Sequence, residues 1–378
     1  MPAYDAIVIG VGGMGSAALY HLARRGVKVL GLEQFDIAHD RGSSHGESRL
    51  IRKAYFEHPD YVPLVRRSYE LWAELEAAAG RKLFHRSGLL LAGPRDGAVV
   101  SGVRRAAAAH ALDIQAIAPK DWRTRFPEFV VSEGMDVLFE PDAGFLEVES
   151  CVRTYVQQAV EYGATVVTGR SVQGWSADGG GVAVRTPDEV YHADRLVICG
   201  GSWSSRLLAS LRLPLEVRRK VVFWFESVGG AYSFRCGCPV FGFDVEGGLL
   251  YGFPSIDERS VKIADHAGGQ AAEDADRLDR RLHPEDEPRV HAFVKAYLPR
   301  LTTKMIRHSV CMYTMTPDEH FIIDRHPEYP HVAYAAGFSG HGFKFAPIVG
   351  SVLADFTVQD RTDEPVGFLR AARPMFPD

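Results

Sequence analysis

The hydrophobic pattern of the first forty residues alternates between short apolar runs and a helical stripe. Residues 6–9 form a continuous apolar run, which is typical of a parallel strand covered on both faces. Leu19, Leu22 and Ala23 follow at helical spacing, and residues 27–32 form a second apolar run. The pattern predicts a strand, a helix and a second strand in that order, which is typical of a parallel α/β unit.

Three glycines connect the first predicted strand to the helix. Gly10, Gly12 and Gly15 form G-x-G-x-x-G, and Glu33 ends the second predicted strand. The first glycine permits a tight turn, the second lets the backbone approach a pyrophosphate, and the third allows close helix–strand packing. Glu33 can accept hydrogen bonds from a ribose hydroxyl and would repel a 2′-phosphate, which disfavours NADP. The unit predicts dinucleotide binding and does not separate FAD from NAD.

Similar patterns return further along the chain. Helical stripes are expected at residues 61–79, 152–163 and 349–356, and apolar runs that lead into glycines at 195–201 and 332–340. Residues 217–306 instead hold aromatic and β-branched runs broken by glycines, which predicts an antiparallel sheet. We therefore expect an α/β fold in which two domains are interleaved in sequence.

The expected domains divide the chain as follows. A Rossmann-like nucleotide-binding domain comprises residues 1–85, 145–215 and 307–378, and a substrate domain comprises residues 86–144 and 216–306. A polar loop rich in Gly and Ser precedes the helix at 61–79. It contains Arg49 and Arg52, which would share a face if a helical turn began there. A solvated loop is the simpler alternative.

Composition limits the class of protein. A chain of 378 residues suits two domains, and a net charge of −5 argues against a general nucleic-acid binder, which needs a clustered basic face. The five cysteines are few and scattered, as in a reducing compartment, and Cys236 and Cys238 lack the second ligand pair that a zinc site needs. With no apolar stretch near the ~20 residues of a membrane span and no visible signal peptide, we expect a cytoplasmic protein without a metal.

Several motifs, taken together, carry a family resemblance. They are the N-terminal fingerprint, SSHGESRLIRKAY, YGFPS with VKIADH, CMYTMTPDEHFIID and AAGFSGHGFKFAP. In this order, from residue 5 to about residue 356, they resemble the monomeric sarcosine oxidase and N-methyltryptophan oxidase family. These flavoenzymes are related to D-amino-acid oxidase. The last two motifs are specific, whereas the dinucleotide fingerprint is not.

The resemblance implies FAD, attached through its 8α-methyl carbon to Cys311, in a monomeric oxidase of secondary amino acids. It implies that Arg49 lies beside the flavin ring and that Lys262 promotes reaction with oxygen. The substrate carboxylate would bind Arg52 and Lys344. The other residues implied are Tyr251, His266 and Tyr313 around the substrate, His45 next to the isoalloxazine, and Ser43, Val172, Gly340, His341 and Gly342 for the cofactor.

Each of these residues also has an ordinary structural reading. Lys262 in VKI would alternate out of a strand towards solvent, His266 and His341 would be hydrogen-bonded structural histidines, and Tyr251 would pack in a sheet. Cys311 alone would be a small buried residue. The combined motifs favour the functional reading, in which two cations orient one carboxylate and a lysine stabilises charge on oxygen. No catalytic base is assigned.

One departure from the family pattern concerns the substrate. Gly242 stands where sarcosine-specific members carry a methionine, and the loop at residues 256–260 is more charged than expected. A glycine there would enlarge the cavity, so larger N-methyl or cyclic amino acids are expected as substrates besides or instead of sarcosine. The alternatives are a flavin dehydrogenase with another electron acceptor, an NAD-dependent dehydrogenase and a non-catalytic dinucleotide-binding protein.

Overall fold

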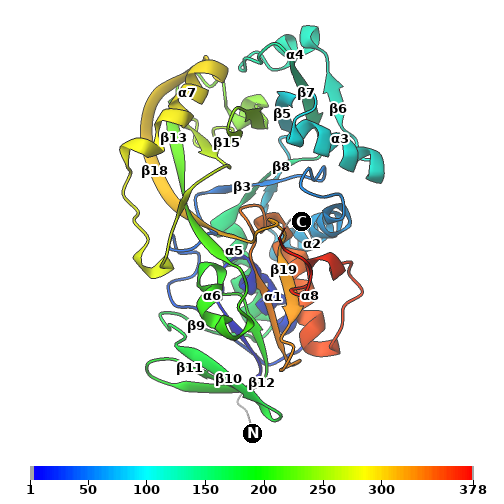
Figure 1. Cartoon of the computed structure of the whole chain (residues 1–378), viewed down its shortest axis with the longest axis vertical. Helices are drawn as coiled ribbons and strands as arrows, with labels where there is room; N and C mark the ends of the chain where they lie inside the picture. Colours follow the sequence, from blue (N-terminus) through cyan, green and yellow to red (C-terminus); the bar gives the residue numbers. More distant parts are fainter. Residues whose placement is uncertain (1–3, 377–378) are drawn as a thin grey trace.

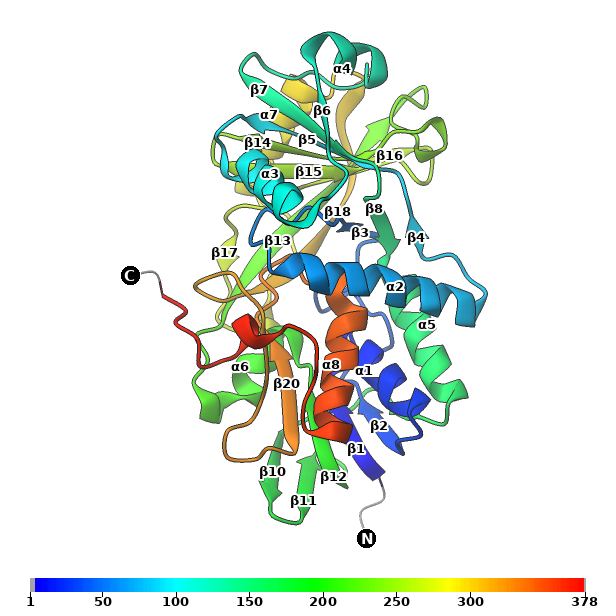
Figure 2. The ribbon, with the colours of Figure 1, turned by 90° about the vertical axis from the view of Figure 1, so that its right-hand side faces the viewer.

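A computed structural model describes residues 4–376, and Figures 1 and 2 show an elongated molecule with two bodies. The body that carries both chain ends is built on an eight-stranded sheet. Its strands are β1 (Tyr4–Ile9), β2 (Val29–Leu32), β9 (Thr165–Val167), β10 (Gly174–Asp178), β11 (Gly181–Arg185), β12 (Val190–Ile198), β19 (Ile322–Arg325) and β20 (Val332–Ala336). β9, β2, β1, β12 and β20 run parallel, whereas β10, β11 and β19 are antiparallel additions.

Long helices pack against this sheet. They are α1 (Gly13–Arg24), α2 (Tyr61–Ala79), α5 (Val148–Glu161) and α8 (Ala346–Gln359), and a short helix α6 (Ser204–Leu207) follows β12. Figure 2 shows α1, α5 and α8 side by side in front of the strands, and α2 crossing above them. A Cβ on Gly350 would lie 2.6 Å from Ala17, so the glycine lets α8 pack closely against α1. The predicted strand–helix–strand unit and the three helical stripes are confirmed.

The second body is built on a nine-stranded sheet. Its strands are β5 (Leu89–Pro94), β6 (Gln115–Ile117), β7 (Met135–Glu140), β13 (Glu216–Ser227), β14 (Val240–Val245), β15 (Gly248–Phe253), β16 (Ser260–Asp265), β17 (Gln270–Ala271) and β18 (Leu301–Met315), with helices α3 (Ala98–His110), α4 (Pro119–Arg125) and α7 (Pro288–Tyr297). Strands within residues 217–306 pair antiparallel, as predicted, and β14 pairs parallel with β5. The long pair β13 and β18 reaches down to the first body (Figure 1).

A three-stranded sheet lies between the two bodies. β3 (Ser48–Ile51) and β4 (Phe84–His85) both pair antiparallel with β8 (Gly144–Glu147). The helical turn considered for Arg49 and Arg52 is therefore wrong, because hydrogen bonding to β8 keeps the backbone of β3 extended. Arg49 lies within the strand, and Arg52 follows its end.

The division into two interleaved domains stays a proposal. Strands of the first sheet come from residues 4–32, 165–198 and 322–336, and strands of the second from 89–140 and 216–315. The expected boundary at residue 307 lies inside β18, which pairs with β13 on both sides of that residue. Over residues 4–376, none of the helices combines the length and the apolar character that crossing a bilayer requires.

Candidate active site

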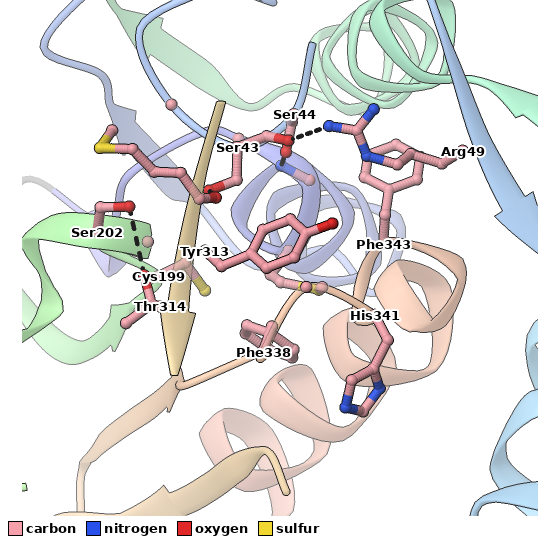
Figure 3. Close-up of a pocket in the computed structure, with 18 of the residues that line it drawn as sticks. Ser43, Ser44, Arg49, Cys199, Ser202, Tyr313, Thr314, Phe338, His341 and Phe343 are labelled. Atoms are coloured by element: carbon pink, nitrogen blue, oxygen red, sulfur yellow. Dashed lines mark hydrogen bonds between the residues drawn. The ribbon is translucent and has the colours of Figure 1, made fainter. Parts of the chain in front are cut away.

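A long cavity is lined by residues of both bodies, and Figure 3 shows part of its wall. Most of the residues predicted from the sequence contribute to it. Those that line it are Gly10, Gly12, Glu33, Ser43, Arg49, Arg52, Val172, Gly242, Tyr251, His266, Tyr313, Gly340, His341, Gly342 and Lys344. Gly15, His45, Lys262 and Cys311 lie outside this wall. Segments far apart in the sequence thus meet at one cavity.

The glycines at the start of α1 are required by close contacts. Gly10 has φ +82°, and a Cβ there would lie 2.5 Å from the carbonyl oxygen of Cys199. A Cβ on Gly15 would lie 1.7 Å from the carbonyl oxygen of Gly10, so this residue brings helix and strand together without lining the cavity. The first turn of α1 opens at the cavity, where free backbone N–H groups favour a phosphate.

Glu33 lies at the same end of the cavity. Its carboxylate accepts hydrogen bonds from the backbone N–H groups of Val11, at 2.8 Å, and Phe35, at 3.1 Å. These contacts hold the side chain in place beside the glycines. Two carboxylate oxygens offer about four acceptor positions, so Glu33 can still accept bonds from ribose hydroxyls. The local geometry fits a dinucleotide.

Arg49 connects the polar loop to Cys311. Its guanidinium donates to the carbonyl oxygens of Ser43, at 2.7 Å, and Ser48, at 3.0 Å, and lies 3.5 Å from the Cys311 sulfur. Ser43 donates its hydroxyl to the carbonyl oxygen of Met312, which ties the loop to β18. Figure 3 shows Ser43, Arg49 and Tyr313 around the cavity. The polar loop is therefore attached to the site and is not a free, solvated loop, which was the simpler alternative.

Two buried cysteines near the cavity differ in their electrostatics. Burial raises the pKa of Cys199 to about 12. Burial would also raise the pKa of Cys311, but the nearby His45 and the Arg49 guanidinium outweigh it and lower the pKa to about 6. A thiol with a depressed pKa is a thiolate at neutral pH and a nucleophile. Cys311 has that character and Cys199 does not.

Lys262 is buried, contrary to the reading of an exposed lysine. Its side chain is 3% exposed, and its ammonium donates to the carbonyl oxygens of Gly46, at 2.6 Å, and Ser48, at 2.7 Å. Burial, followed by the charge of Arg49, holds the pKa of Lys262 well below its usual range. Lys262 lines a small second cavity with Trp224 and Phe253. The structure therefore places a buried lysine side chain just behind the polar loop.

The opposite end of the large cavity holds two more buried cations. Arg52 forms a buried ion pair with Glu57, with 2.6 Å from its Nη2 to each carboxylate oxygen, and the rings of Tyr55 and Phe56 lie 4.3 and 4.2 Å from its guanidinium carbon. Burial opposes ionisation of Glu57, but Arg52 outweighs it and lowers the pKa of Glu57 to about 2. For Lys344, burial and then Arg52 lower the pKa to about 7.

Side chains of β15, β18 and the loop after β16 form the facing wall. The hydroxyls of Tyr251 and Tyr313 lie 3.3 Å apart, and the His266 ring centroid is 5.7 Å from that of Tyr313. Burial lowers the pKa of His266 to about 4, so its ring is neutral at pH 7. A Cβ on Gly340 would lie 2.2 Å from the Tyr313 ring, and this glycine therefore admits the aromatic side chain.

The space beside Gly242 is smaller than its missing side chain suggests. A Cβ at this position would lie 2.9 Å from Leu91 Cδ2 and 3.3 Å from Leu249 Cδ1. These two leucines pack over the glycine and themselves line the cavity. A glycine thus does not by itself leave a void, because neighbouring leucines fill part of the volume. Substrate size depends on Leu91 and Leu249 as well as on Gly242.

Some residues of the site were missed by sequence reasoning. Tyr55, Phe56 and Glu57 lie three to five residues after Arg52 in the sequence and surround its guanidinium. Their only signal in the sequence is two aromatic residues and a carboxylate close to an arginine, a pattern common on protein surfaces.

For metals, residues 4–376 contain no cluster of three or more His, Cys, Asp or Glu side chains suited to an ion.

Comparison with known proteins agrees with this geometry. The DAO family of FAD dependent oxidoreductases matches residues 5–356. Monomeric sarcosine oxidase of Bacillus sp. (strain B-0618) is 41% identical over 376 residues, covering 98% of this chain and 96% of that protein. N-methyl-L-tryptophan oxidase of Yersinia pestis (strain Pestoides F) is 37% identical over 360 residues and covers 95% of both.

Solved structures show the same fold at lower identity. NikD, an unusual amino acid oxidase essential for nikkomycin biosynthesis, superposes with a TM-score of 0.87 at 22% identity and covers all of both chains. L-proline dehydrogenase from P. horikoshii superposes with a TM-score of 0.85 at 23% identity, covering 99% of this chain and 98% of that one. The resemblance found in the motifs is confirmed, and the chain belongs to the FAD-dependent oxidoreductase family, in the group of monomeric sarcosine oxidases and N-methyl-L-tryptophan oxidases.

Proposed function

We propose that this protein oxidises secondary amino acids, either N-methylated or cyclic, and reduces O2 to H2O2. The observation that carries the proposal is the buried cation pair Arg52 and Lys344 in the same cavity as Gly10 and Glu33. In the overall reaction the substrate loses two electrons and two protons from its C–N bond, and O2 gains them. The imine then reacts with water, which releases formaldehyde and the amino acid from an N-methyl substrate.

The chain's residues fit FAD along this cavity. Gly10 and Gly12 leave room for a pyrophosphate, Glu33 can accept from a ribose, and Ser43, Val172, Gly340 and Gly342 line the continuation. The Nε2 atom of His45 is buried and has no hydrogen-bond partner among residues 4–376, so it is available to a bound group. FAD held there would supply the redox chemistry: it would take a hydride equivalent from the carbon of the C–N bond, the nitrogen would lose a proton, and the electrons would pass to O2.

Cys311 is the proposed point of covalent attachment. Its depressed pKa supports a thiolate, and an attachment through sulfur needs a nucleophile. Arg49 lies 3.5 Å from this sulfur and would stabilise negative charge near it. Because Arg49 is itself held by two backbone carbonyls, its charge is fixed in position before any ligand binds.

The substrate carboxylate is proposed to bind between Arg52 and Lys344. Glu57 neutralises Arg52 in this structure: both of its carboxylate oxygens accept from Nη2, whereas Nη1 donates to the carbonyl oxygen of Ala54. A bound amino acid would therefore compete with Glu57 for the guanidinium. Lys344 lies in the same wall and has one ammonium proton left after donating to the His341 carbonyl oxygen and the Tyr55 hydroxyl. Two cations would fix the orientation of the substrate.

The amine nitrogen is proposed to react in its neutral form. Positive charges at Arg49, Arg52 and Lys344 disfavour a further positive charge nearby and so lower the pKa of a bound ammonium group. His266 is neutral and faces Tyr313, so it can contact the substrate without adding charge. No base has to be assigned, because the surrounding cations already favour loss of the amine proton.

Lys262 is the residue proposed to promote the reaction with O2, in preference to another electron acceptor. Its ammonium is buried and held by two carbonyl oxygens, and a preorganised cation in a dry pocket stabilises the negative charge that oxygen acquires. A flavin dehydrogenase that passes electrons to a carrier remains the second candidate. We further propose a monomeric, cytoplasmic enzyme with the two interleaved domains described above.

Two measurements on separate samples test the proposal: acid denaturation of the purified protein, and a substrate screen on the native enzyme. The denatured polypeptide should keep yellow colour and flavin fluorescence, and native enzyme should release H2O2 with sarcosine, N-methyl amino acids, pipecolate or proline. Reduction of a dye without H2O2 would favour the dehydrogenase instead.

A further inference from the structure

One buried tyrosine connects both proposed carboxylate-binding cations. Tyr55 is fully buried, and its ring lies 4.3 Å from the guanidinium carbon of Arg52 and 5.1 Å from the ammonium nitrogen of Lys344. Its hydroxyl lies 3.4 Å from the same ammonium nitrogen and 2.5 Å from Nδ1 of His341. Both cations therefore contact the same side chain, the first through the ring and the second through ring and hydroxyl.

The hydrogen bonds around His341 determine which way the Tyr55 hydroxyl points. Nε2 of His341 lies 2.9 Å from the carbonyl oxygen of Glu319, and a carbonyl can only accept, so Nε2 carries the hydrogen. Burial lowers the pKa of His341 to about 3, and the ring is neutral. Nδ1 is then an acceptor, and it takes the hydroxyl hydrogen of Tyr55. The lone pairs of the Tyr55 oxygen are left for Lys344.

Lys344 is held on two sides. It donates to the carbonyl oxygen of His341, at 2.6 Å, and to the Tyr55 oxygen, at 3.4 Å. Both contacts can form only with a hydrogen on the lysine nitrogen, and both favour the charged ammonium. The charged and titratable groups that face Lys344 are Arg52, Tyr55, Glu57, His266 and His341.

We propose that Tyr55 is a positioning residue that orients Lys344 and keeps it charged, so that an amino-acid carboxylate meets a preformed pair of cations. The inference rests on the proposed function, in which Arg52 and Lys344 bind that carboxylate. Among the groups facing Lys344, Arg52 disfavours its charge and Glu57 favours it. When a substrate displaces Glu57, the Tyr55 hydroxyl stays in place and continues to favour the ammonium.

The pH dependence follows from the sign of these effects. Burial, followed by Arg52, lowers the pKa of Lys344 to about 7, so its charge is lost as pH rises above neutrality. An anionic ligand should bind with full affinity below that pKa and progressively less above it. Removing the Tyr55 hydroxyl removes a hydrogen-bond acceptor that favours the charged form of Lys344. The pKa of Lys344 should therefore fall further, and the affinity for an anionic ligand should begin to decrease at a lower pH.

Tyr61 supplies a matched control. Its ring centroid lies 4.8 Å from that of Tyr55 in the same buried cluster. Its hydroxyl lies 3.2 Å from Nδ1 of His320 and accepts a hydrogen bond from the backbone N–H of Phe321, also at 3.2 Å, and neither contact involves Lys344. Tyr61→Phe and Tyr55→Phe thus each remove one buried, hydrogen-bonded hydroxyl and keep the ring.

The test is a titration of the flavin-containing enzyme with propionate between pH 6 and 9, followed by the flavin absorbance. We expect Tyr55→Phe to raise the Kd for propionate at pH 6.5 roughly tenfold or more, as for a lost hydrogen bond to a charged group. The variant should also begin to lose affinity for propionate at a lower pH than the wild type does. Tyr61→Phe should follow wild type. Identical curves for the two variants would overturn the role of Tyr55.

A second variant tests the titrating group itself. Lys344→Arg keeps a cation that does not deprotonate in this range, so the pH-dependent loss of affinity should disappear. If affinity for propionate still decreases with rising pH in Lys344→Arg, another group titrates and the inference is wrong. This outcome does not depend on whether the Tyr55 variant folds. If Lys344→Met binds propionate as wild type does, the carboxylate site of the proposed function is wrong, and the role of Tyr55 falls with it.

Discussion

The two ends of the cavity are built in different ways. At the dinucleotide end, Gly10, Gly12 and Glu33 come from one strand–helix–strand unit, in which a positive φ favours glycine at Gly10 and the backbone N–H of Val11 holds Glu33. At the substrate end, Arg52 and Lys344 come from segments almost three hundred residues apart, and burial with neighbouring charges decides their properties. The first end can be recognised from a local pattern, whereas the second exists only after folding.

The largest expected effect lies between the two ends, at the sulfur near Arg49. Cys311→Ser should abolish covalent flavin completely, because serine provides no thiolate. Cys199→Ser is the matched control, since Cys199 is also buried at the cavity but burial alone raises its pKa. Flavin fluorescence of the denatured polypeptide on a gel is the readout. Flavin that remains attached in Cys311→Ser would refute the assignment.

The next largest effect concerns the substrate end alone. Arg52→Met should lower kcat/KM for N-methyl amino acids by about 10² to 10³, because a buried charge pair is lost and Glu57 is left unpaired. The flavin content should stay close to wild type, which would confirm that the two ends are separable. The methyl ester of the same substrate is the control, and an equal loss with the ester would contradict a carboxylate-binding role.

A smaller effect is expected at Lys262, and in only one half-reaction. Lys262→Met should slow the reaction of the reduced enzyme with O2 by about 10²-fold, as expected when one preorganised electrostatic contact is removed. The anaerobic reaction with substrate should stay much closer to wild type. Lys304→Met is a control, since Lys304 lies in β18 of the same sheet and its ammonium pairs with Glu226 at the surface. Stopped-flow absorbance separates the steps, and equal losses in both would refute the role of Lys262.

The smallest effect concerns substrate size. Leu91→Ala should raise the ratio of kcat/KM for N-methyl aromatic amino acids over sarcosine by roughly tenfold, because it opens space beside Gly242. Leu90 precedes it on the same strand and packs in a different hydrophobic cluster. Leu90→Ala should therefore lower thermal stability without changing the ratio. An unchanged ratio in Leu91→Ala would show that this wall does not limit substrate size.

Particular residues show why prediction from sequence succeeds at one end and stops at the other. Gly15 could be predicted because a Cβ there would collide with the carbonyl oxygen of Gly10, and Gly10 because its positive φ of +82° favours glycine; both reasons lie within the same local unit. The burial of Lys262 could not, because alternation along a strand predicts solvent on its face, whereas the rings of Trp224 and Phe253 and the loop at Gly46 cover it after folding.

The space beside Gly242 illustrates a second reason. The glycine predicts room, but Leu91 and Leu249 approach from two other strands and fill part of it. The same holds for Tyr55, whose hydroxyl acquires its partners from a loop almost three hundred residues away. Family motifs identified Lys262, Lys344 and Cys311 as candidates, whereas their ionisation depends on tertiary contacts that no local pattern contains.

The central claim is that this chain is a flavin oxidase of secondary amino acids. Its most direct test is the stoichiometry of the complete reaction in air with the best substrate of a series that includes sarcosine, N-methyl aromatic amino acids, pipecolate and proline. The account predicts one H2O2 formed per O2 and per substrate consumed, with yellow colour that bleaches reversibly when oxygen is removed. Turnover that requires NAD, or substrate oxidation without H2O2, would contradict it.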